Sequence, residues 1–261
     1  ALQQNDLATA EPLLKKVLAK GAISEQGVAA YYLGQIAEDR KAYDEAAGYY
    51  RQVVSGDQFA PAQIRVAGLL AKKDGGLDPA RSHLQESARR YPPAETQFLV
   101  AEAELLRDAG RTAEALALLD KALAKKPDQP EVLYDAAMLA EKLDRMDVVE
   151  TNLRRVIELR PDNAHAYNAL GYSLADRNLR LEEARTLIER AHTLAPNDPF
   201  IMDSLGWVLY RQGDLNAALQ YLQRAYAIKA DAEIAAHLGE VLWRLDRRDE
   251  ALRTWTEALK R

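Results

Sequence analysis

Apolar residues recur along this chain with the spacing of short helices that each bury one side. One clear stripe, at i, i+3, i+4 and i+7 of a helix, consists of Met202, Leu205, Gly206 and Leu209. The facing stripe of the helix that follows consists of Ala218, Leu222 and Ala225. Because small residues here face large ones, the pattern predicts pairs of short helices that pack closely against each other.

The same arrangement returns at an interval of about 34 residues. Leu-Gly pairs in the first helices begin at Leu33, Leu170, Leu205 and Leu238. Small residues in the second helices follow at Ala46, Ala184, Ala218 and Ala251. Prolines that end the second helices stand at Pro92, Pro127, Pro161 and Pro196. Self-similarity at this period is typical of α-solenoids, in which each helix pair buries its apolar side against its neighbours.

The turns inside the pairs carry residue types that tolerate the left-handed conformation in which helices end. These residues are Gly75, Gly110, Asp144, Asn178, Gly213 and Asp246. After one of these turns, Asp78 and Pro79 favour a helix that is capped by Asp78 and has Pro79 in its first turn.

Together these motifs resemble the tetratricopeptide repeat (TPR) family, whose pattern is W-x2-L-G-x2-Y, then A-x3-F, then Pro. The resemblance implies an all-α fold, a right-handed superhelical α-solenoid that forms a single domain over residues 1–261 without an internal boundary. Residues 1–26 are expected to be a lone second helix. Full repeats are expected to start at Gly27, Pro61, Thr96, Pro130, Ala164, Pro199 and Ala232. Two repeats depart from the pattern, because Glu102-Ala103 and Ala136-Ala137 stand where Leu-Gly belongs.

Composition and charge argue against several classes of function. The 35 basic and 40 acidic residues give a net charge of −5, which argues against a nucleic-acid surface. Cysteine is absent, which excludes disulfides and thiolate metal sites, and no two of the 4 histidines lie at i, i+4. No stretch approaches the roughly 18 apolar residues of a membrane span. No nucleophile elbow or phosphate-binding loop occurs, so we expect a protein without catalytic activity, cofactor or metal.

A second stripe on the first helices, opposite the core stripe, is the candidate binding site. The TPR resemblance implies that this stripe lies on the concave face and binds peptides or partner segments. In the last three repeats it is rich in aromatic and charged residues, types that are enriched at binding hot spots. The candidates are His165, Asn168, Tyr172, Phe200, Asp203, Trp207, Tyr210, Arg211, Glu240, Trp243 and Arg244. The alternative is that these rings pack only against the next helix.

Residues 163–259 also resemble the C-terminal part of proteobacterial outer-membrane TPR lipoproteins, most distinctively at Gly206-Trp207 and in the run that ends at Trp243. One such protein is an adaptor that binds a periplasmic carboxyl-terminal processing protease and helps to present substrates. The resemblance implies a periplasmic protein that is anchored to the outer membrane by a lipidated cysteine upstream of Ala1.

Two alternatives stay open: a cytosolic assembly or regulatory TPR protein, and the targeting domain of a larger enzyme. We also expect the chain to be part of a longer protein, because residues 1–26 lack a first helix and no capping helix follows the last one. Solenoid ends normally need a polar cap, so the uncapped ends are expected to self-associate.

Overall fold

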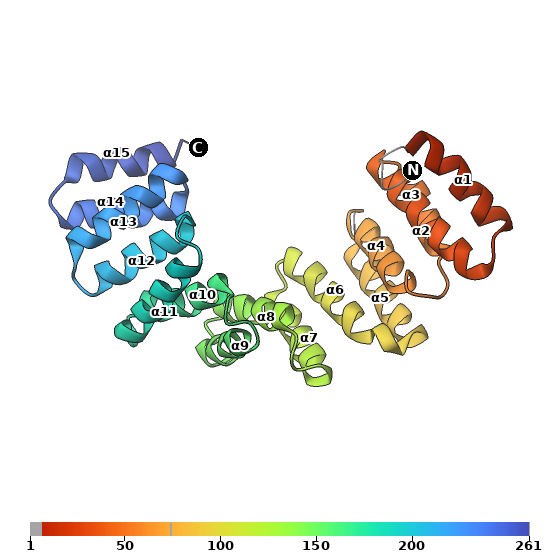
Figure 1. Ribbon diagram of the computed structural model, residues 1–261, viewed down its shortest axis with the longest axis horizontal. Coiled ribbons are helices and arrows are strands. Elements are labelled where there is room, and N and C mark those ends of the chain that lie inside the picture. Colours follow the sequence, from red (N-terminus) through yellow and green to blue (C-terminus); the bar gives the residue numbers. More distant parts are fainter. Residues whose placement is uncertain (1–6, 74, 261) are drawn as a thin grey trace. The chain divides into compact units, whose positions relative to one another are not determined.

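The computed structural model describes residues 7–73 and 75–260, and every regular element in these ranges is a helix (Figure 1). The helices up to residue 127 are α1 (Leu7–Lys20), α2 (Ile23–Asp39), α3 (Tyr43–Arg51), α4 (Phe59–Ala71), α5 (Leu77–Arg90), the 3-10 helix η2 (Pro92–Ala94), α6 (Glu95–Asp108) and α7 (Thr112–Lys125). The later helices are α8 (Pro130–Lys142), α9 (Met146–Leu159), α10 (Ala164–Asp176), α11 (Leu181–Leu194), α12 (Pro199–Arg211), α13 (Leu215–Ile228), α14 (Ala232–Arg244) and α15 (Arg248–Ala258). The all-α prediction is confirmed.

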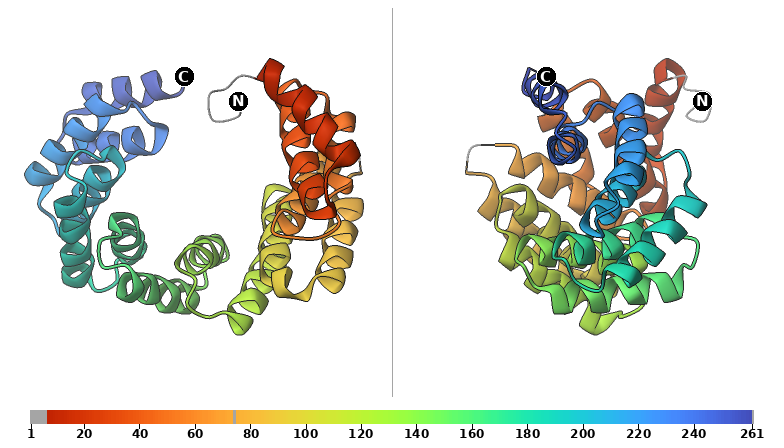
Figure 2. Two further views of the ribbon diagram at one scale, coloured as in Figure 1. Left: turned by 45° about the vertical axis from the view of Figure 1, so that its right-hand side comes forward. Right: turned by 90° about the vertical axis from the view of Figure 1, so that its left-hand side faces the viewer.

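The helices form two compact units, residues 1–127 and residues 128–261. Within each unit the chain forms successive helix pairs, and the first helix of each pair contacts the second most extensively (Figure 2). The pairs are α2/α3, α4/α5 and α6/α7 in the first unit, and α8/α9, α10/α11, α12/α13 and α14/α15 in the second. Helix α1 packs against α2, and residues 1–6 of the expected lone second helix lie outside the described residues. The continuity of one solenoid across the two units stays a prediction.

The predicted repeat starts at Pro130, Ala164, Pro199 and Ala232 coincide with the first residues of α8, α10, α12 and α14. The three earlier repeats begin before the predicted residue, with α2 starting at Ile23, α4 at Phe59 and α6 at Glu95. At α2 the Glu25 carboxylate accepts a hydrogen bond from the Ala22 backbone N–H at 3.0 Å. This hydrogen bond satisfies one of the unpaired backbone donors at the helix start. The repeat pattern of the first helices does not predict it.

The turns behave as the sequence predicts. All six of the predicted turn residues have positive φ: 67° at Gly75, 75° at Gly110, 54° at Asp144, 56° at Asn178, 91° at Gly213 and 61° at Asp246. Lys41 and Arg180 adopt the same conformation without being residue types that favour it. The predicted cap at Asp78 is wrong, because α5 begins at Leu77 and its cap position is Gly76.

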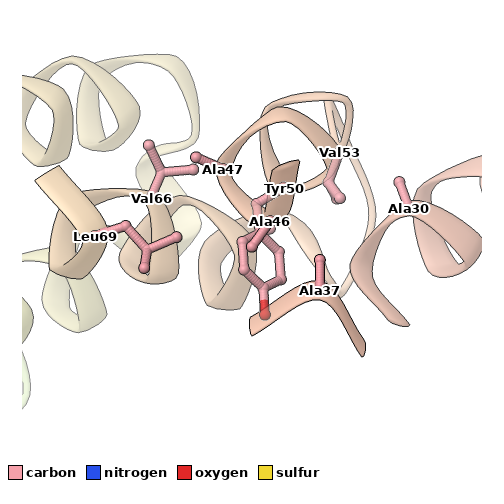
Figure 3. Close-up of a cluster of buried hydrophobic side chains, with 9 residues drawn as sticks. Ala30, Ala37, Ala46, Ala47, Tyr50, Val53, Val66 and Leu69 are labelled. Atoms are coloured by element: carbon pink, nitrogen blue, oxygen red, sulfur yellow. The ribbon is translucent and has the colours of Figure 1, made fainter. Parts of the chain in front are cut away.

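Tyr50 is the centre of the core between the first two pairs (Figure 3). Its ring is fully buried among small and branched side chains, and its hydroxyl donates a hydrogen bond to the Glu38 carboxylate at 2.9 Å. Burial, reinforced by Glu38, raises the pKa of Tyr50 well above its usual range. The ring lies directly over Gly34, where an added Cβ would be 2.5 Å from Tyr50 Cε1. The glycine is therefore what allows α2 and α3 to approach each other.

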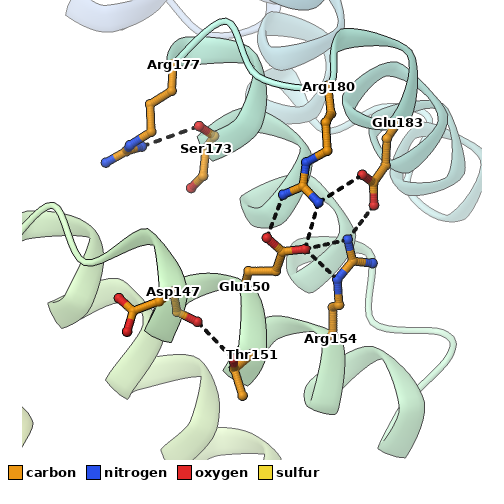
Figure 4. A network of polar contacts seen from close by, with 8 residues as sticks. All are labelled: Asp147, Glu150, Thr151, Arg154, Ser173, Arg177, Arg180 and Glu183. Carbon is orange, nitrogen blue, oxygen red and sulfur yellow. Dashed lines mark hydrogen bonds and ion pairs between the residues drawn. The ribbon is translucent and has the colours of Figure 1, made fainter.

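A charged network links α9 to the start of α11 on the second helices of adjacent repeats (Figure 4). The Glu150 carboxylate accepts hydrogen bonds from Arg180 at 2.5 and 3.0 Å and from Arg154 at 2.7 and 2.9 Å. Glu183 completes the network by contacting both arginines. The hydrogen bond from Arg180, followed by that from Arg154, lowers the pKa of Glu150 to about 2 against the opposing effect of burial.

We expect Gly34→Ala to lower the free energy of unfolding by about 1–3 kcal/mol, because the new methyl group overpacks the contact with Tyr50. The matched control is Gly48→Ala on α3, where an added Cβ meets nothing within 4 Å. That change is expected to stabilise the protein by about 0.5–1 kcal/mol, since alanine is the better helix former. Urea unfolding followed by circular dichroism measures both, and equal effects would contradict the close-approach argument.

We expect the stabilisation from Glu150 to be lost at acidic pH. Its folded pKa lies below the unfolded value of 4.5, so the contribution is complete above pH 4.5 and disappears as the pH falls towards 2. The melting temperature of Glu150→Gln should therefore fall below that of the unmodified protein at pH 7 and converge with it near pH 2. Glu257→Gln removes the same charge at an exposed position of α15 and is the matched control, and equal effects of the two changes would contradict the prediction.

Candidate partner-binding face

The eleven residues predicted for binding, called the candidate face below, all lie on α10, α12 and α14. Helix α12 contacts both α10 and α14, so the three helices that carry this candidate face are neighbours in the second unit. The exposed members are His165, Phe200, Glu240, Trp243 and Arg244. The half-buried members are Asn168, Tyr172, Tyr210 and Arg211, and the buried members are Asp203 and Trp207.

Trp207 is packed inside this face, with 6% of its surface exposed. Its ring stacks on His237 of α14 with centroids 4.1 Å apart and on Tyr210 with centroids 5.0 Å apart. The Arg211 guanidinium lies 5.5 Å from the centroid of the Trp207 ring. Trp207 therefore packs against the first helix of the next repeat, α14, and leaves little surface for a partner. This environment matches the alternative that the rings pack only against the next helix.

Beneath Trp207, Asp203 and His237 form a buried polar pair. His237 Nδ1 lies 3.0 Å from both carboxylate oxygens of Asp203, so it carries the proton and donates to that carboxylate. Burial raises the pKa of Asp203. Burial also lowers the pKa of His237, but the hydrogen bond and charge of Asp203 outweigh it and the net direction is upward. The pair joins α12 to α14 with a charge-assisted bond.

His237 contacts residues of the candidate face, and the sequence analysis did not select it. It lies one repeat interval, 34 residues, after Asp203. Reading positions across consecutive repeats, instead of along one helix, is the signal that would have found it.

Two tyrosine hydroxyls hold acidic residues on the same face. Tyr172 of α10 donates to Glu233 of α14 at 2.9 Å, which links two residues that are 61 positions apart in the chain. Tyr210 donates to Glu240 at 2.6 Å. Burial, with Glu240 as the hydrogen-bond acceptor, raises the pKa of Tyr210. These bonds fix the positions of the carboxylates, so the polar part of the face is preorganised.

The exposed rings are Phe200 and Trp243, with 41% and 42% of their surfaces accessible. Each is accompanied by a cation: Lys229 Nζ lies 4.2 Å from the Phe200 ring centroid, and the Arg248 guanidinium lies 5.2 Å from that of Trp243. One edge of Trp243 also meets Trp255 of α15, with centroids 6.0 Å apart. These two rings are the apolar surface that the face offers to another molecule.

Within the described ranges, no helix has the length and apolar character needed to cross a membrane. The same residues contain no group of three His, Asp or Glu side chains arranged to hold a metal ion.

A chain of stacked helix pairs with a preorganised aromatic and charged face defines the class of α-solenoid interaction proteins. Comparison with known proteins identifies the family within this class. Sequence models described as tetratricopeptide repeat match residues 1–62 and 66–130, 106–171, 162–231 and 232–256. The chain belongs to the tetratricopeptide repeat family, whose members generally act as scaffolds for protein–protein interaction and usually have no enzymatic activity.

Among curated proteins, a TPR repeat-containing protein of Pseudomonas aeruginosa is 43% identical over 210 residues, which cover 80% of this chain and 35% of that protein. The chain therefore spans about a third of the length of this relative. Two solved structures show the same fold. A tetratricopeptide repeat protein from Parabacteroides merdae has a TM-score of 0.68 and 13% identity over 90% of this chain and 92% of its own. A TPR protein described as having an unusual peptide-binding site has a TM-score of 0.56 and 20% identity over 69% of this chain and 92% of its own.

The two tryptophans of the face should respond differently to truncation. Trp207→Ala removes a buried ring and is expected to lower the free energy of unfolding by about 3–5 kcal/mol. Trp243→Ala removes a ring that is nearly half exposed and should lower it by about 1 kcal/mol or less. Chemical unfolding of the two variants under the same conditions measures the difference, and equal losses would show that the two rings have the same structural role.

Proposed function

We propose that this chain is a non-enzymatic scaffold that binds a partner protein or peptide through the face of α10, α12 and α14. The observation that carries the proposal is the pair of exposed rings, Phe200 and Trp243, beside carboxylates held by tyrosine hydroxyls. Rigid aromatic anchors surrounded by fixed polar groups are what well-packed interfaces use as hot spots. A structural neighbour described as a peptide-binding TPR protein is consistent with an extended ligand.

We further propose that the protein works in the cell envelope as an adaptor for a carboxyl-terminal processing protease and presents substrates to it. The resemblance of residues 163–259 to outer-membrane TPR lipoproteins supports this proposal, and that segment contains the whole candidate face. In this proposal the protein is periplasmic and is tethered by a lipidated cysteine upstream of Ala1. A cytosolic assembly protein and the targeting domain of a larger enzyme are the competing proposals.

Binding to a purified carboxyl-terminal processing protease from the same organism tests the partner. We expect the double change Phe200→Ala and Trp243→Ala to weaken this binding at least tenfold, because both exposed rings of the face are lost. Tyr43→Ala is the matched control, since Tyr43 is 43% exposed on α3 of the first unit and should leave binding unchanged. The scaffold proposal loses its site if the control and the double variant bind equally well.

Absence of any binding to the protease by the unmodified protein would exclude the adaptor proposal and leave the scaffold proposal to be tested with other partners. Fractionation of cells that express the full-length reading frame tests the location. The outer-membrane proposal expects the protein in the outer-membrane fraction, and substitution of an upstream lipobox cysteine should release it into the soluble periplasm. Recovery in the cytosol would support the competing proposal.

A further inference from the structure

The repeat that starts near Thr96 departs from the family pattern at a buried position. Glu102 stands where four other repeats have a core leucine, and it is 3% exposed. Both Arg81 Nε and Gln85 Nε2, from the preceding second helix α5, donate to its Oε1 at 2.9 Å. Burying a carboxylate is costly unless it is paired. The carboxylate is thus neutralised by Arg81, and the apolar volume of a leucine side chain is missing from this contact between repeats.

A cavity of about 460 Å³ lies at this place, between α5, α6 and α7 of the first unit. Its floor is apolar and buried, formed by Leu84, Phe98 and Leu99. The half-buried side chains of Ala88 and Leu118 also line it. Cavities of about 300–1,000 Å³ with mainly apolar linings and a few polar groups are the size and type that hold small molecules.

The rim of the cavity is cationic. Arg89 and Lys121 line it and are exposed, and neither forms an ion pair with another residue in the described ranges. The two carboxylates of the cavity are already paired, Glu95 with Lys125 at 2.7 Å and Glu102 with Arg81. Lys125, with a weaker contribution from Lys121, lowers the pKa of Glu95, so this carboxylate stays ionised and paired. The lining therefore combines a buried apolar floor with two exposed cations that form no direct ion pair with another described residue.

We propose that this cavity binds a small amphipathic anion, an aliphatic chain that ends in a single carboxylate. The chain lies against Leu84, Phe98 and Leu99, where its burial removes apolar surface from water. The carboxylate stays at the rim, where Arg89 and Lys121 supply the opposite charge. A cation would meet these two residues with the same charge, and a neutral chain would leave them unpaired. The site involves the first unit alone and does not depend on the partner-binding face.

Isothermal titration calorimetry with decanoate, decanol and decylamine tests the proposal on the whole chain. We expect decanoate to bind at least tenfold more tightly than decylamine, which is protonated at pH 7, with decanol between them. The double variant Arg89→Gln and Lys121→Gln should weaken decanoate binding at least fivefold, in line with two exposed charge pairs. It should also remove the preference for decanoate over decylamine. Both positions are on the surface, so the fold should be unaffected.

A matched double variant, Arg90→Gln and Arg107→Gln, changes the same net charge at residues that do not line the cavity, and it should bind decanoate as the unmodified protein does. Ala88→Phe should fill the cavity and abolish binding while the circular dichroism spectrum stays helical. The proposal is overturned if decanoate does not bind, if it binds no better than decylamine, or if the matched variant loses as much affinity as the Arg89/Lys121 variant.

Discussion

The close approach of the two helices in each pair is the contact on which the rest of this structure depends. In four of the pairs a glycine of the first helix lies against one large side chain of the second: Tyr50 on Gly34, Ile188 on Gly171, Leu222 on Gly206 and Trp255 on Gly239. The large residue changes in shape from pair to pair, but the glycine does not. A short helix gains little stability alone, so this interlocking is what makes each repeat a unit that can stack.

Because that contact uses one stripe of each first helix, the opposite stripe is free to differ between repeats. In α10, α12 and α14 it has become a polar and aromatic network with a buried layer and an exposed layer. The buried layer is Asp203, His237 and Trp207, which fix α14 on α12. The exposed layer includes Phe200 and Trp243. In the proposed function this arrangement has a physical basis, since an interface anchor binds best when the residues that support it are already ordered.

The repeat that carries Glu102 shows the converse case, in which the core stripe itself departs from the pattern. A leucine at this position would contribute to stability by burial, whereas the carboxylate needs Arg81 and Gln85 to be tolerated. Departures from a local rule that are compensated in this way are expected where a site has a function. The cavity that Glu102 lines lies at the repeat where this departure occurs.

The sequence by itself determined the helix pairs, their 34-residue interval and the positive-φ turns, because periodicity and backbone preference act within a few residues. It missed the early start of α2, which a side-chain contact to Ala22 stabilises, and it misplaced the cap of α5. Only the tertiary structure decided which tryptophan of the face is buried. Trp207 and Trp243 both lie on the same stripe, but Trp207 is covered by His237 from the next repeat and Trp243 keeps 42% of its surface exposed. Burial of that kind depends on side chains a full repeat away, which no pattern within one helix contains.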